Sequence, residues 1–538
     1  MQPVLNIEDV KRVEVALTRV GVSVSELMHR AGCAAAQEVL ELGGVRSAAI
    51  FTGMGNNGGD GWVAAEALRS RGVEVTVVTP IDPDQLSGDL ARQVAQSAVR
   101  SGVPTMVGPS REEIEELLAG SDVALDCMLG TGFHGQVRAP FDIWIECLNA
   151  SGARVVAVDV PSGLSAQTGL AQGPAVTADM TVTMIALKPG LLADNGRDLC
   201  GSIVVAPLAE QTERLVIEAD PVAWRTDLVD YLDVMVEPTN AVDKFSRGSV
   251  LVVGGSSRFT GAPIMAARAA ARAGAGYVTL AVPEAIVAAL QAQLVEIPVV
   301  GLPCDADGVL TSEAAEKAVR LAKSNTVTLV GPGMQVAGGT SAVVSALLAS
   351  DVPLVVDADG LNSLARLTDN SLPDFPEVTR RNAALVLTPH RRELGRLVNR
   401  SSNPPASLIG QLECARQIIW GDGGSELCVV AKGTATGCVG VDQAVLPKPG
   451  PAALATAGSG DVLAGMIASL LAQCGGRSAD LPLLCALACE IHGYAGSLAV
   501  EAYGARGVMA SDIIERIGLA ADAIEEHAMF PEVGDVQE

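Results

Sequence analysis

The sequence predicts an α/β protein with two doubly wound domains, and three observations lead to this. Its 538 residues exceed what one ordinary hydrophobic core holds. Hydrophobic residues make up 49% of the chain while aromatic residues make up only 3%, and there are 57 glycines. Short Val-rich runs alternate with amphipathic stretches along both halves, which is typical of helices packed closely on parallel strands.

Each half repeats strand, turn and helix. In the first half the expected strands are Ala48–Thr52, Val73–Val78, Val123–Leu125, Arg154–Val158 and Met180–Met184. In the second half they are Ser249–Val253, Tyr277–Val282, Thr326–Val330, Pro353–Val356, Ala384–Leu387 and Leu427–Ala431. Stretches between them, such as Gly61–Arg71 and Ala262–Ala273, have the polar and apolar pattern of helices.

The rhythm breaks at residues 209–243, which are rich in charge, poor in glycine and contain Pro221 and Pro238. We therefore predict a first domain over residues 1–220, a linker over 221–240 and a second domain over 241–530.

Charge and cysteine usage exclude several classes of protein. The net charge of −25 and the pI of about 4.6 argue against a nucleic-acid binder, which needs a basic surface. The 11 cysteines include no CxxC pair, so reduced, cytosolic thiols are the simpler interpretation. The N-terminal MQPVLNIEDVKRVE lacks the apolar core of a signal peptide, and no continuous apolar run reaches the ~18 residues of a membrane span. We expect a cytoplasmic protein without a membrane or nucleic-acid partner.

A glycine-rich turn in the first half points to an anionic ligand. The strand Ala48–Thr52 continues into Gly53–Gly61, which holds five glycines, two asparagines and Asp60. Glycines allow a close backbone approach, and the following helix N-terminus offers free amides to phosphate. The alternative is a tight turn without a ligand.

Two further strands of the first half end in an aspartate. Asp126 is followed by Gly130–Gln136, and Asp159 by a loop containing Ser162 and Gly163. In open α/β sheets the ligand lies beyond the carboxyl ends of the strands, so three such ends are expected to form one crevice. For either aspartate alone, helix capping is the commoner explanation. His134 is tempting as an acid or base, but a lone loop histidine is more often only exposed.

The second half carries a comparable set of motifs, of which Gly458-Ser459-Gly460-Asp461, placed before a helix expected at Val462–Gln473, is the most telling. Its amides suit a transferring phosphoryl group, and Asp461 is placed to accept a proton from an attacking hydroxyl. Lys432 with the following threonines suits a nucleotide phosphate tail. The alternative for Asp461 is an N-cap. Asp359 is equally compatible with a metal ligand and with a simple turn.

Together these motifs resemble the family of bifunctional NAD(P)H-hydrate repair enzymes over nearly the whole chain. In the first half the resemblance rests on Asn56–Asp60, Asp126 with Gly130–Gln136, Asp159–Gly163 and the opening Leu27-Met28…Ala31-Gly32. In the second half it rests on Thr260–Pro263, Gly331–Gly333, Asp357–Leu364, Lys432–Thr436 and Gly458–Gly465. It implies a Rossmann-like NAD(P)H-hydrate epimerase followed by a ribokinase-like, ADP-dependent NAD(P)H-hydrate dehydratase.

The resemblance also implies ligands and roles. The substrates are NAD(P)HX and ADP, with K⁺ in the epimerase and Mg²⁺ with ADP in the dehydratase, and we expect a homo-oligomer. Asp159 and Asp461 are the expected catalytic residues. Epimerase hydrate-binding positions fall on Asn56, Asn57, Gly58, Gly59, Asp60, Gly130, Thr131, Gly132, Phe133, His134, Gly135, Gln136 and Asp159, and the potassium ligands on Asn57, Asp126 and Ser162. Dehydratase hydrate-binding positions fall on Ala262, Gly333, His390 and Asp461, and nucleotide-binding positions on Lys432, Gly433, Thr434, Ala435, Thr436 and Gly460.

One departure from the family pattern concerns the Thr-Pro-His motif. The family continues it with Pro-Gly-Glu, whereas Arg391-Arg392-Glu393 follows His390 here. Two other functions remain open at this point: a small-molecule kinase with an N-terminal dinucleotide-sensing domain, and a non-catalytic NAD-binding scaffold.

Overall fold

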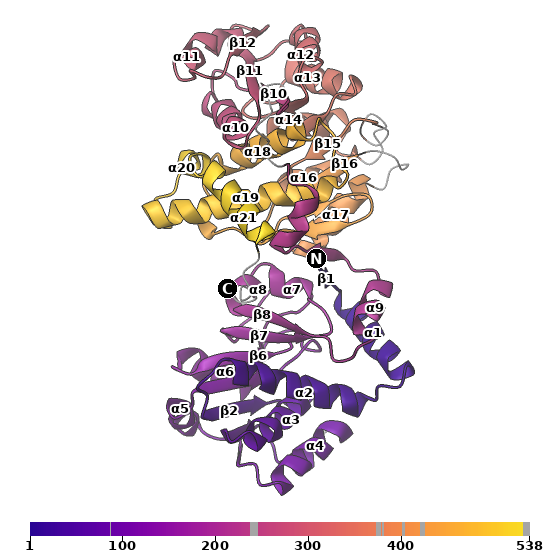
Figure 1. Ribbon diagram of the computed structural model, residues 1–538, viewed down its shortest axis with the longest axis vertical. Coiled ribbons are helices and arrows are strands. Elements are labelled where there is room, and N and C mark those ends of the chain that lie inside the picture. Colours follow the sequence, from indigo (N-terminus) through magenta and orange to yellow (C-terminus); the bar gives the residue numbers. More distant parts are fainter. Residues whose placement is uncertain are drawn as a thin grey trace. The chain divides into compact units, whose positions relative to one another are not determined.

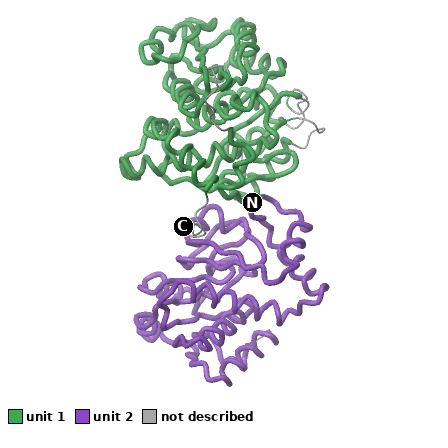
Figure 2. The backbone as a smooth tube through the Cα atoms, in the orientation of Figure 1, with its two compact units in different colours: residues 1, 224–535 green, residues 2–223, 536–538 purple. Residues whose placement is uncertain are grey.

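The computed structural model describes residues 1–86, 88–236, 246–372, 378, 381–400, 404–419 and 426–530. The chain divides into two compact units (Figure 2): an N-terminal unit of residues 2–223 and a C-terminal unit of residues 224–535. Each unit has its own sheet covered by helices, so the prediction of a two-domain α/β protein is confirmed.

The N-terminal unit is a parallel sheet in the order β4-β3-β2-β5-β6-β7-β8 (Figure 1). Its strands are β2 (Ser47–Thr52), β3 (Glu74–Thr79), β4 (Thr105–Val107), β5 (Val123–Cys127), β6 (Arg154–Val158), β7 (Met180–Met184) and β8 (Ser202–Ala206). A short strand, β1 (Gln2–Val4), precedes them in the chain and is not part of this sheet. Its helices are α1 (Ile7–Arg19), α2 (Val24–Glu41), α3 (Asn56–Ser70), η1 (Pro83–Gln85), α4 (Asp89–Arg100), α5 (Arg111–Ala119), α6 (Phe141–Ala150), α7 (Pro189–Leu192), α8 (Gly196–Leu199) and α9 (Thr212–Glu218).

Alternating side chains of β2 show that this sheet is buried on both faces. Ala48 and Ile50 belong to the apolar cluster that includes α2 and α3. Ala49 and Phe51 belong to the opposite cluster, where Trp144 of α6 packs edge-on against Phe51. Burial on both faces explains why this strand reads as a continuous apolar run.

The C-terminal unit has a larger mixed sheet in the order β9-β18-β17-β16-β15-β14-β13-β10-β11-β12. Its strands are β9 (Ala223–Arg225), β10 (Ser249–Val253), β11 (Tyr277–Pro283), β12 (Val299–Leu302), β13 (Val327–Val330), β14 (Leu354–Val356), β15 (Leu385–Leu387), β16 (Leu427–Ala431), β17 (Gly437–Val439) and β18 (Ala444–Leu446). β16 to β12 pair in parallel, whereas β17 is antiparallel to both of its neighbours.

The helices of this unit lie on both sides of its sheet (Figure 1). They are η2 (Leu228–Asp233), α10 (Gly261–Arg272), η3 (Glu284–Ile286), α11 (Val287–Gln291), α12 (Ala314–Ala322), α13 (Gly338–Ala349), α14 (Asp359–Leu367), α16 (Arg391–Leu397), α17 (Leu408–Ile419), η5 (Ala452–Leu454), α18 (Ser459–Gln473), α19 (Leu481–Tyr503), α20 (Ala510–Ile514) and α21 (Ile517–Met529).

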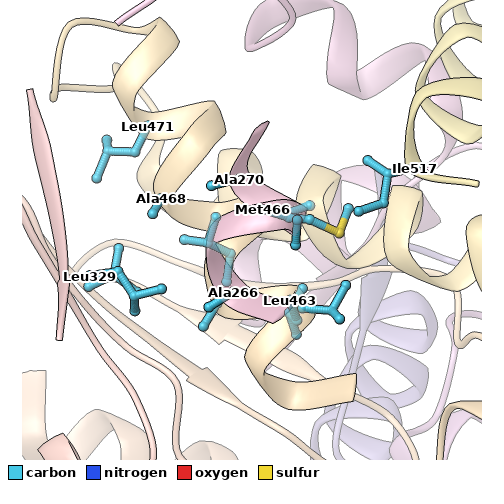
Figure 3. Packing of buried hydrophobic residues seen from close by; sticks show 14 of the residues in the cluster. Ala266, Ala270, Leu329, Leu463, Met466, Ala468, Leu471 and Ile517 are labelled. Carbon is cyan, nitrogen blue, oxygen red and sulfur yellow. The ribbon is translucent and has the colours of Figure 1, made fainter. Parts of the chain in front are cut away.

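Close packing of α18 on α10 fixes the start of α18 relative to the sheet. Ala266 and Ala270 of α10 lie in one apolar cluster with Leu463 and Met466 of α18 (Figure 3). A Cβ at Gly465 would lie 2.2 Å from the Ala266 carbonyl oxygen, so only glycine permits this separation of the two helices. The sequence GSGDVLAG therefore serves packing as well as the turn that precedes it.

The segment predicted as a linker, 221–240, contains folded structure in its described part. β9 pairs with β18, and η2 follows it. Tyr231 of η2 is fully buried, and its hydroxyl lies 2.8 Å from Thr226 Oγ1 and 3.2 Å from Glu490 Oε2 of α19. Residues 237–240 of that prediction lie outside the described residues.

Among the residues that the structure describes, one helix is long and apolar enough to cross a membrane, although no continuous apolar run of that length was expected. This helix is α19, and 78% of its most apolar window is buried inside the protein. Its mean hydropathy comes from core-facing residues such as Leu484, Cys485 and Ala488, which is the pattern of a core helix.

Candidate functional sites

The first candidate site lies at the carboxyl ends of β2, β5 and β6, which are neighbours in the parallel sheet. Asp126 lies within β5, and Asp159 directly follows β6. Residues Asn56–Asp60 form the first turns of α3 and not a separate loop, which differs from the expectation that this helix begins at Gly61. A Cβ at Gly58 would lie 2.1 Å from the Gly53 carbonyl oxygen, so the glycine allows the helix to begin this early.

Asp126 and Ser162 are in direct contact and fully buried. Ser162 donates to the Asp126 carboxylate from its hydroxyl at 2.6 Å and from its backbone amide at 2.7 Å. Burial raises the pKa of Asp126 to about 6, against the opposing effect of these hydrogen bonds. Asp126 is therefore held by hydrogen bonds within the site and does not cap a helix.

The side-chain amide of Asn57 is a second polar feature of this site. Both its side-chain oxygen and its nitrogen are buried and have no hydrogen-bond partner among the described residues. A Cβ at Gly130 would lie 3.2 Å from the Asn57 Cβ and 3.6 Å from Asp159 Oδ2, so these three residues line one space. Asn57, Asp126 and Ser162 are the oxygen-bearing residues that the sequence analysis assigned to a potassium ion, and this assignment stays a prediction.

Asp159 is paired with Lys188, a residue that the sequence argument missed. Lys188 Nζ lies 2.6 Å from Asp159 Oδ1, and the lysine side chain is 0% exposed. Lys188 follows β7, and a lysine in the run ALKPG carries no signal that identifies its partner from sequence. Only the placement of the strand ends brings the two residues together.

Two more carboxylates face Asp159. Burial raises the pKa of Asp60 well above its usual value, and the charges of Asp159 and Glu14 raise it further. The pKa of Glu14, on α1, is also raised, by burial and then by Asp159, while Lys188 opposes the shift. Asp60 therefore keeps its proton to a higher pH than an exposed aspartate would.

The predicted loop Gly130–Gln136 is joined to this site only at its first residue. Gly132, His134, Gly135 and Gln136 are exposed, and Thr131 and Phe133 are half-buried. The single hydrogen bond recorded within the loop is from the Phe133 amide to the Gly130 carbonyl oxygen, 3.0 Å. The loop is open to solvent beside the Asn57 and Asp159 side chains.

The second candidate site lies at the carboxyl ends of β14, β15 and β16, which are adjacent and parallel. Asp357, Thr388 and Lys432 each directly follow one of these strands. Thr388 Oγ1 donates to Asp357 Oδ1 at 2.6 Å, and Lys432 Nζ donates to the same oxygen at 2.8 Å. Burial lowers the pKa of Lys432, but Asp357, Glu393 and Asp461 outweigh it, so the pKa is raised above its usual value.

The GSGD motif forms the N-terminus of α18. Gly458 is the N-cap with φ +91°, and the helix begins at Ser459, three residues earlier than expected. Asp461 therefore lies in the first turn and is not the cap. A Cβ at Gly460 would lie 3.3 Å from Lys432 Nζ, so the lysine reaches the start of this helix. Burial raises the pKa of Asp461 to about 7, Asp357 adds to the shift, and Lys432 opposes it.

His390 is the N-cap of α16 and lies beside Lys432. Its Nδ1 accepts from the Arg392 and Glu393 amides, and the Glu393 carboxylate accepts from the His390 amide at 2.9 Å. The altered Arg391-Arg392 pair is thus accommodated in a regular first turn, with both side chains exposed. Burial raises the pKa of Glu393 to about 7.

A buried histidine on α19 contacts the serine of the GSGD motif. His492 Nε2 of α19 lies 3.1 Å from Ser459 Oγ. Burial lowers the pKa of His492 to about 4, and Lys432 lowers it further, so the ring is neutral at physiological pH. This histidine sits in an apolar helical run, and sequence reasoning did not select it.

The other predicted residues of this site fall into two groups. Ala262 and Gly333 are neighbours, since a Cβ at Gly333 would lie 3.3 Å from the Ala262 Cβ. Past Lys432, Gly433 and Thr434 are exposed while Ala435 is buried and Thr436 is half-buried. Asp359 accepts from the Gln335 amide at 3.0 Å, which agrees with the turn alternative.

Comparisons with known proteins match both units. Residues 250–518 match the family described as NAD(P)H-hydrate dehydratase, and residues 24–190 match the family described as YjeF-related protein N-terminus. A bifunctional NAD(P)H-hydrate repair enzyme of Salinibacter ruber is 36% identical over 91% of both chains. Its counterpart in Coxiella burnetii is 34% identical over 94% of this chain and 97% of that protein.

Solved structures resemble the C-terminal unit more distantly. An ADP/ATP-dependent NAD(P)H-hydrate dehydratase from Bacillus subtilis, co-crystallised with ATP and Mg²⁺, is 21% identical with a TM-score of 0.45, covering 56% of this chain and 99% of that one. A ribokinase-like superfamily protein from Enterococcus faecalis is 22% identical with the same TM-score, covering 56% of this chain and 96% of that one.

Proposed function

The chain belongs to the family of bifunctional NAD(P)H-hydrate repair enzymes, and from this premise we propose which residues carry out each of its two activities. The protein is an NAD(P)H-hydrate epimerase and an NAD(P)H-hydrate dehydratase in one chain. The observation that carries the proposal is similar in both units: an aspartate at the end of a parallel strand is paired with a lysine, buried in the first unit and half-buried in the second, beside a glycine-rich helix N-terminus.

In the N-terminal unit, Asp159 moves the proton that epimerisation at carbon 6 of the hydrated ring requires. Inverting this carbon needs the 6-hydroxyl to lose its proton while the ring opens, or to leave as water and return. The free Oδ2 of Asp159 faces the space shared with Asn57 and Gly130. The amides at the start of α3 and the open loop Gly130–Gln136 hold the pyrophosphate and the remaining hydrate.

A potassium ion is the cation that best fits Asn57, Asp126 and Ser162. One carboxylate, one hydroxyl and one amide oxygen provide a ligand set of low charge, and hydrogen bonding of Ser162 fixes the carboxylate. An ion held by these residues would supply a fixed positive charge to the site. Asn57, on the first turn of α3, would offer its unpartnered amide oxygen to that ion.

In the C-terminal unit, Asp461 takes the proton from the 6-hydroxyl as that oxygen attacks the terminal phosphorus of ADP. The bond from phosphorus to the bridging oxygen breaks, and AMP leaves. The ring-nitrogen lone pair then expels phosphate from carbon 6, and loss of a proton from carbon 5 restores the dihydronicotinamide. Phosphorylation is required because hydroxide is a poor leaving group. The amides of Gly458–Gly460 stabilise the charge on the phosphoryl oxygens, worth ~2.7–4 kcal/mol per donor in comparable anion holes.

The nucleotide is held by Lys432 and the residues up to Thr436, with Gly460 allowing the lysine to reach the helix N-terminus. Mg²⁺ would be bound mainly through the nucleotide phosphates, whose charge it offsets. This fits the chain, because the described residues include no group of three or more His, Cys, Asp or Glu side chains arranged to hold a metal. His390, together with the neighbouring pair Ala262 and Gly333, holds the hydrate.

We propose that the enzyme acts in the cytoplasm. All 11 cysteines are free thiols, and reduced thiols are typical of cytosolic proteins. A homo-oligomer stays a prediction.

The proposal is tested by giving the protein mixed R and S hydrates with ADP, with ATP or without nucleotide. Regenerated NAD(P)H is followed by absorbance, and the two epimers are separated by chromatography. We expect epimerisation without nucleotide and dehydration of the S form only with it. The variant Asp461→Asn is expected to lose dehydration by about 100-fold or more while epimerisation continues. Near-normal dehydration by this variant would show that Asp461 is not the base. A phosphorylated hydrate or vitamin-like alcohol that accumulates as a stable product would favour the small-molecule kinase instead.

A further inference from the structure

We propose that Lys188 is the positioning residue of the epimerase site: its ammonium binds one oxygen of the Asp159 carboxylate and fixes the side chain, which leaves the other oxygen free to face the hydrate. The inference rests on the proposed epimerase function. It gives a role to a residue that lies 29 positions beyond Asp159 in the chain, outside all the motifs discussed above.

The hydrogen bonds of Lys188 exclude a direct part in proton transfer. An ammonium group has three N–H donors. Lys188 Nζ directs them to Asp159 Oδ1 at 2.6 Å, Thr183 Oγ1 at 2.7 Å and the Met184 carbonyl oxygen at 2.8 Å. With all three donors used and no exposed surface, the group has no free position for a substrate atom.

The same contacts orient Asp159. Lys188 and the Met184 amide, at 3.4 Å, both bind Oδ1, so the carboxylate can present only Oδ2 toward Gly130 and Asn57. The Asp159 backbone has φ +68°, in the left-handed region that is uncommon for a residue with a side chain. Such a conformation persists where the surroundings hold it, and here the Asp159 amide donates to the Val182 carbonyl oxygen at 2.7 Å.

The positive charge of Lys188 matters because two ionisable groups that interact with Asp159 are acids. Asp60 faces it from α3 and Glu14 from α1. Without the ammonium, three carboxyl groups would share a poorly hydrated space, and the Asp159 carboxylate would lose its ion pair. A buried lysine with three fixed acceptors is thus the element that distinguishes Asp159 from its neighbours.

The experiment compares Lys188→Met, Lys188→Ala and Thr183→Val in the full-length protein. Epimerisation is followed by chromatography without nucleotide, and ADP-dependent dehydration of the S hydrate and thermal unfolding are measured in parallel. We expect Lys188→Met to lower the epimerisation rate by about 100-fold, in the range of a lost acid or base. Dehydration should stay normal. Thr183→Val removes one acceptor but keeps the charge, and it should lower epimerisation by several-fold.

Rescue distinguishes charge from packing. Ethylammonium is expected to restore epimerisation by about tenfold or more in Lys188→Ala, where it can fill the cavity, and to leave Lys188→Met unchanged; neutral propanol should restore nothing. Near-wild-type epimerisation by Lys188→Met, or equal rescue by propanol, would overturn the inference. If the Lys188 variants do not fold, an unchanged rate in Thr183→Val would overturn it instead. Failure of the wild-type protein to epimerise would contradict the proposed function itself, so the two failures are separable.

Discussion

Removal of Lys432 should move the pH dependence of dehydration to higher pH. Asp461 acts as a base only when it is ionised, and burial raises its pKa to about 7 while Lys432 opposes that shift. In the wild-type protein the ionised fraction rises from roughly one-tenth at pH 6 to roughly nine-tenths at pH 8, so we expect the rate to rise about tenfold between these values. The change is on the acid side: activity is lost as the pH falls through about 7.

The size of the shift follows from the position of the ammonium group. Lys432 Nζ lies at the start of α18, within 3.3 Å of where a Gly460 Cβ would be, and it is paired with the nearly buried Asp357. An opposite charge this close changes a carboxyl pKa by about 1–3 units. In Lys432→Met a shift of one unit would reduce the ionised fraction of Asp461 at pH 7 from about a half to about a tenth, a loss of about fivefold beyond any loss of nucleotide affinity.

The assay measures kcat for dehydration of the S hydrate from pH 6 to 9 at saturating Mg²⁺ and ADP. Comparison of the variant with the wild type removes the contribution of the substrates' own ionisation, since it is common to both. Lys323→Met is the matched control, because Lys323 is exposed at the end of α12. The reasoning would be refuted if the acid limb of Lys432→Met stayed at the wild-type pH or moved below it.

Two further predictions concern the cation and the core. Replacing K⁺ with Li⁺ should slow epimerisation but not the proton transfer at Asp461. The affinity for K⁺ should weaken as the pH falls through about 6, where Asp126 takes up a proton. Equal epimerisation rates in the two salts across this pH range would count against a potassium site. Tyr231→Phe should lower the free energy of unfolding of the C-terminal unit by about 1–3 kcal/mol, because Thr226 and Glu490 would lose their buried hydrogen-bond partner. Denaturant unfolding measures this loss, with Tyr503→Phe at an exposed site as the control. An equal loss of stability in the two variants would contradict the prediction.

The strands that the sequence predicted were those that are buried on both faces. β6, β7, β10 and β16 have the predicted bounds, because each is a short run of mostly buried residues on both faces of its sheet. The antiparallel β17 and β18 were missed. They have three residues each, too few for a periodic pattern, and they are defined by pairing with β16 and β9, which no local pattern shows.

The same distinction separates predicted from missed site residues. Glycine-rich turns and the aspartates that follow strands are local signals, so Asp159 and Asp461 were selected from sequence. Glu393 and His492 reach the second site from helices whose sequences look like ordinary core or capping patterns. Their proximity to Lys432 depends on how α16 and α19 pack on the sheet, and only the folded structure supplies that.

The two lysines show why the ion pairs of such a site are the hardest part to predict from the sequence. Lys188 follows β7 and pairs with an aspartate that follows the adjacent β6; Lys432 follows β16 and pairs with Asp357, two strands away. In both cases the partner is fixed by strand order, and strand order in a doubly wound sheet does not follow chain order. A buried lysine without an ion-pair partner would lose its proton, or its end of the strand would move out of the core to keep the charge in water. A lysine that directly follows a buried strand therefore needs a carboxylate nearby, but the sequence does not identify which one, because that depends on the order of the strands in the sheet.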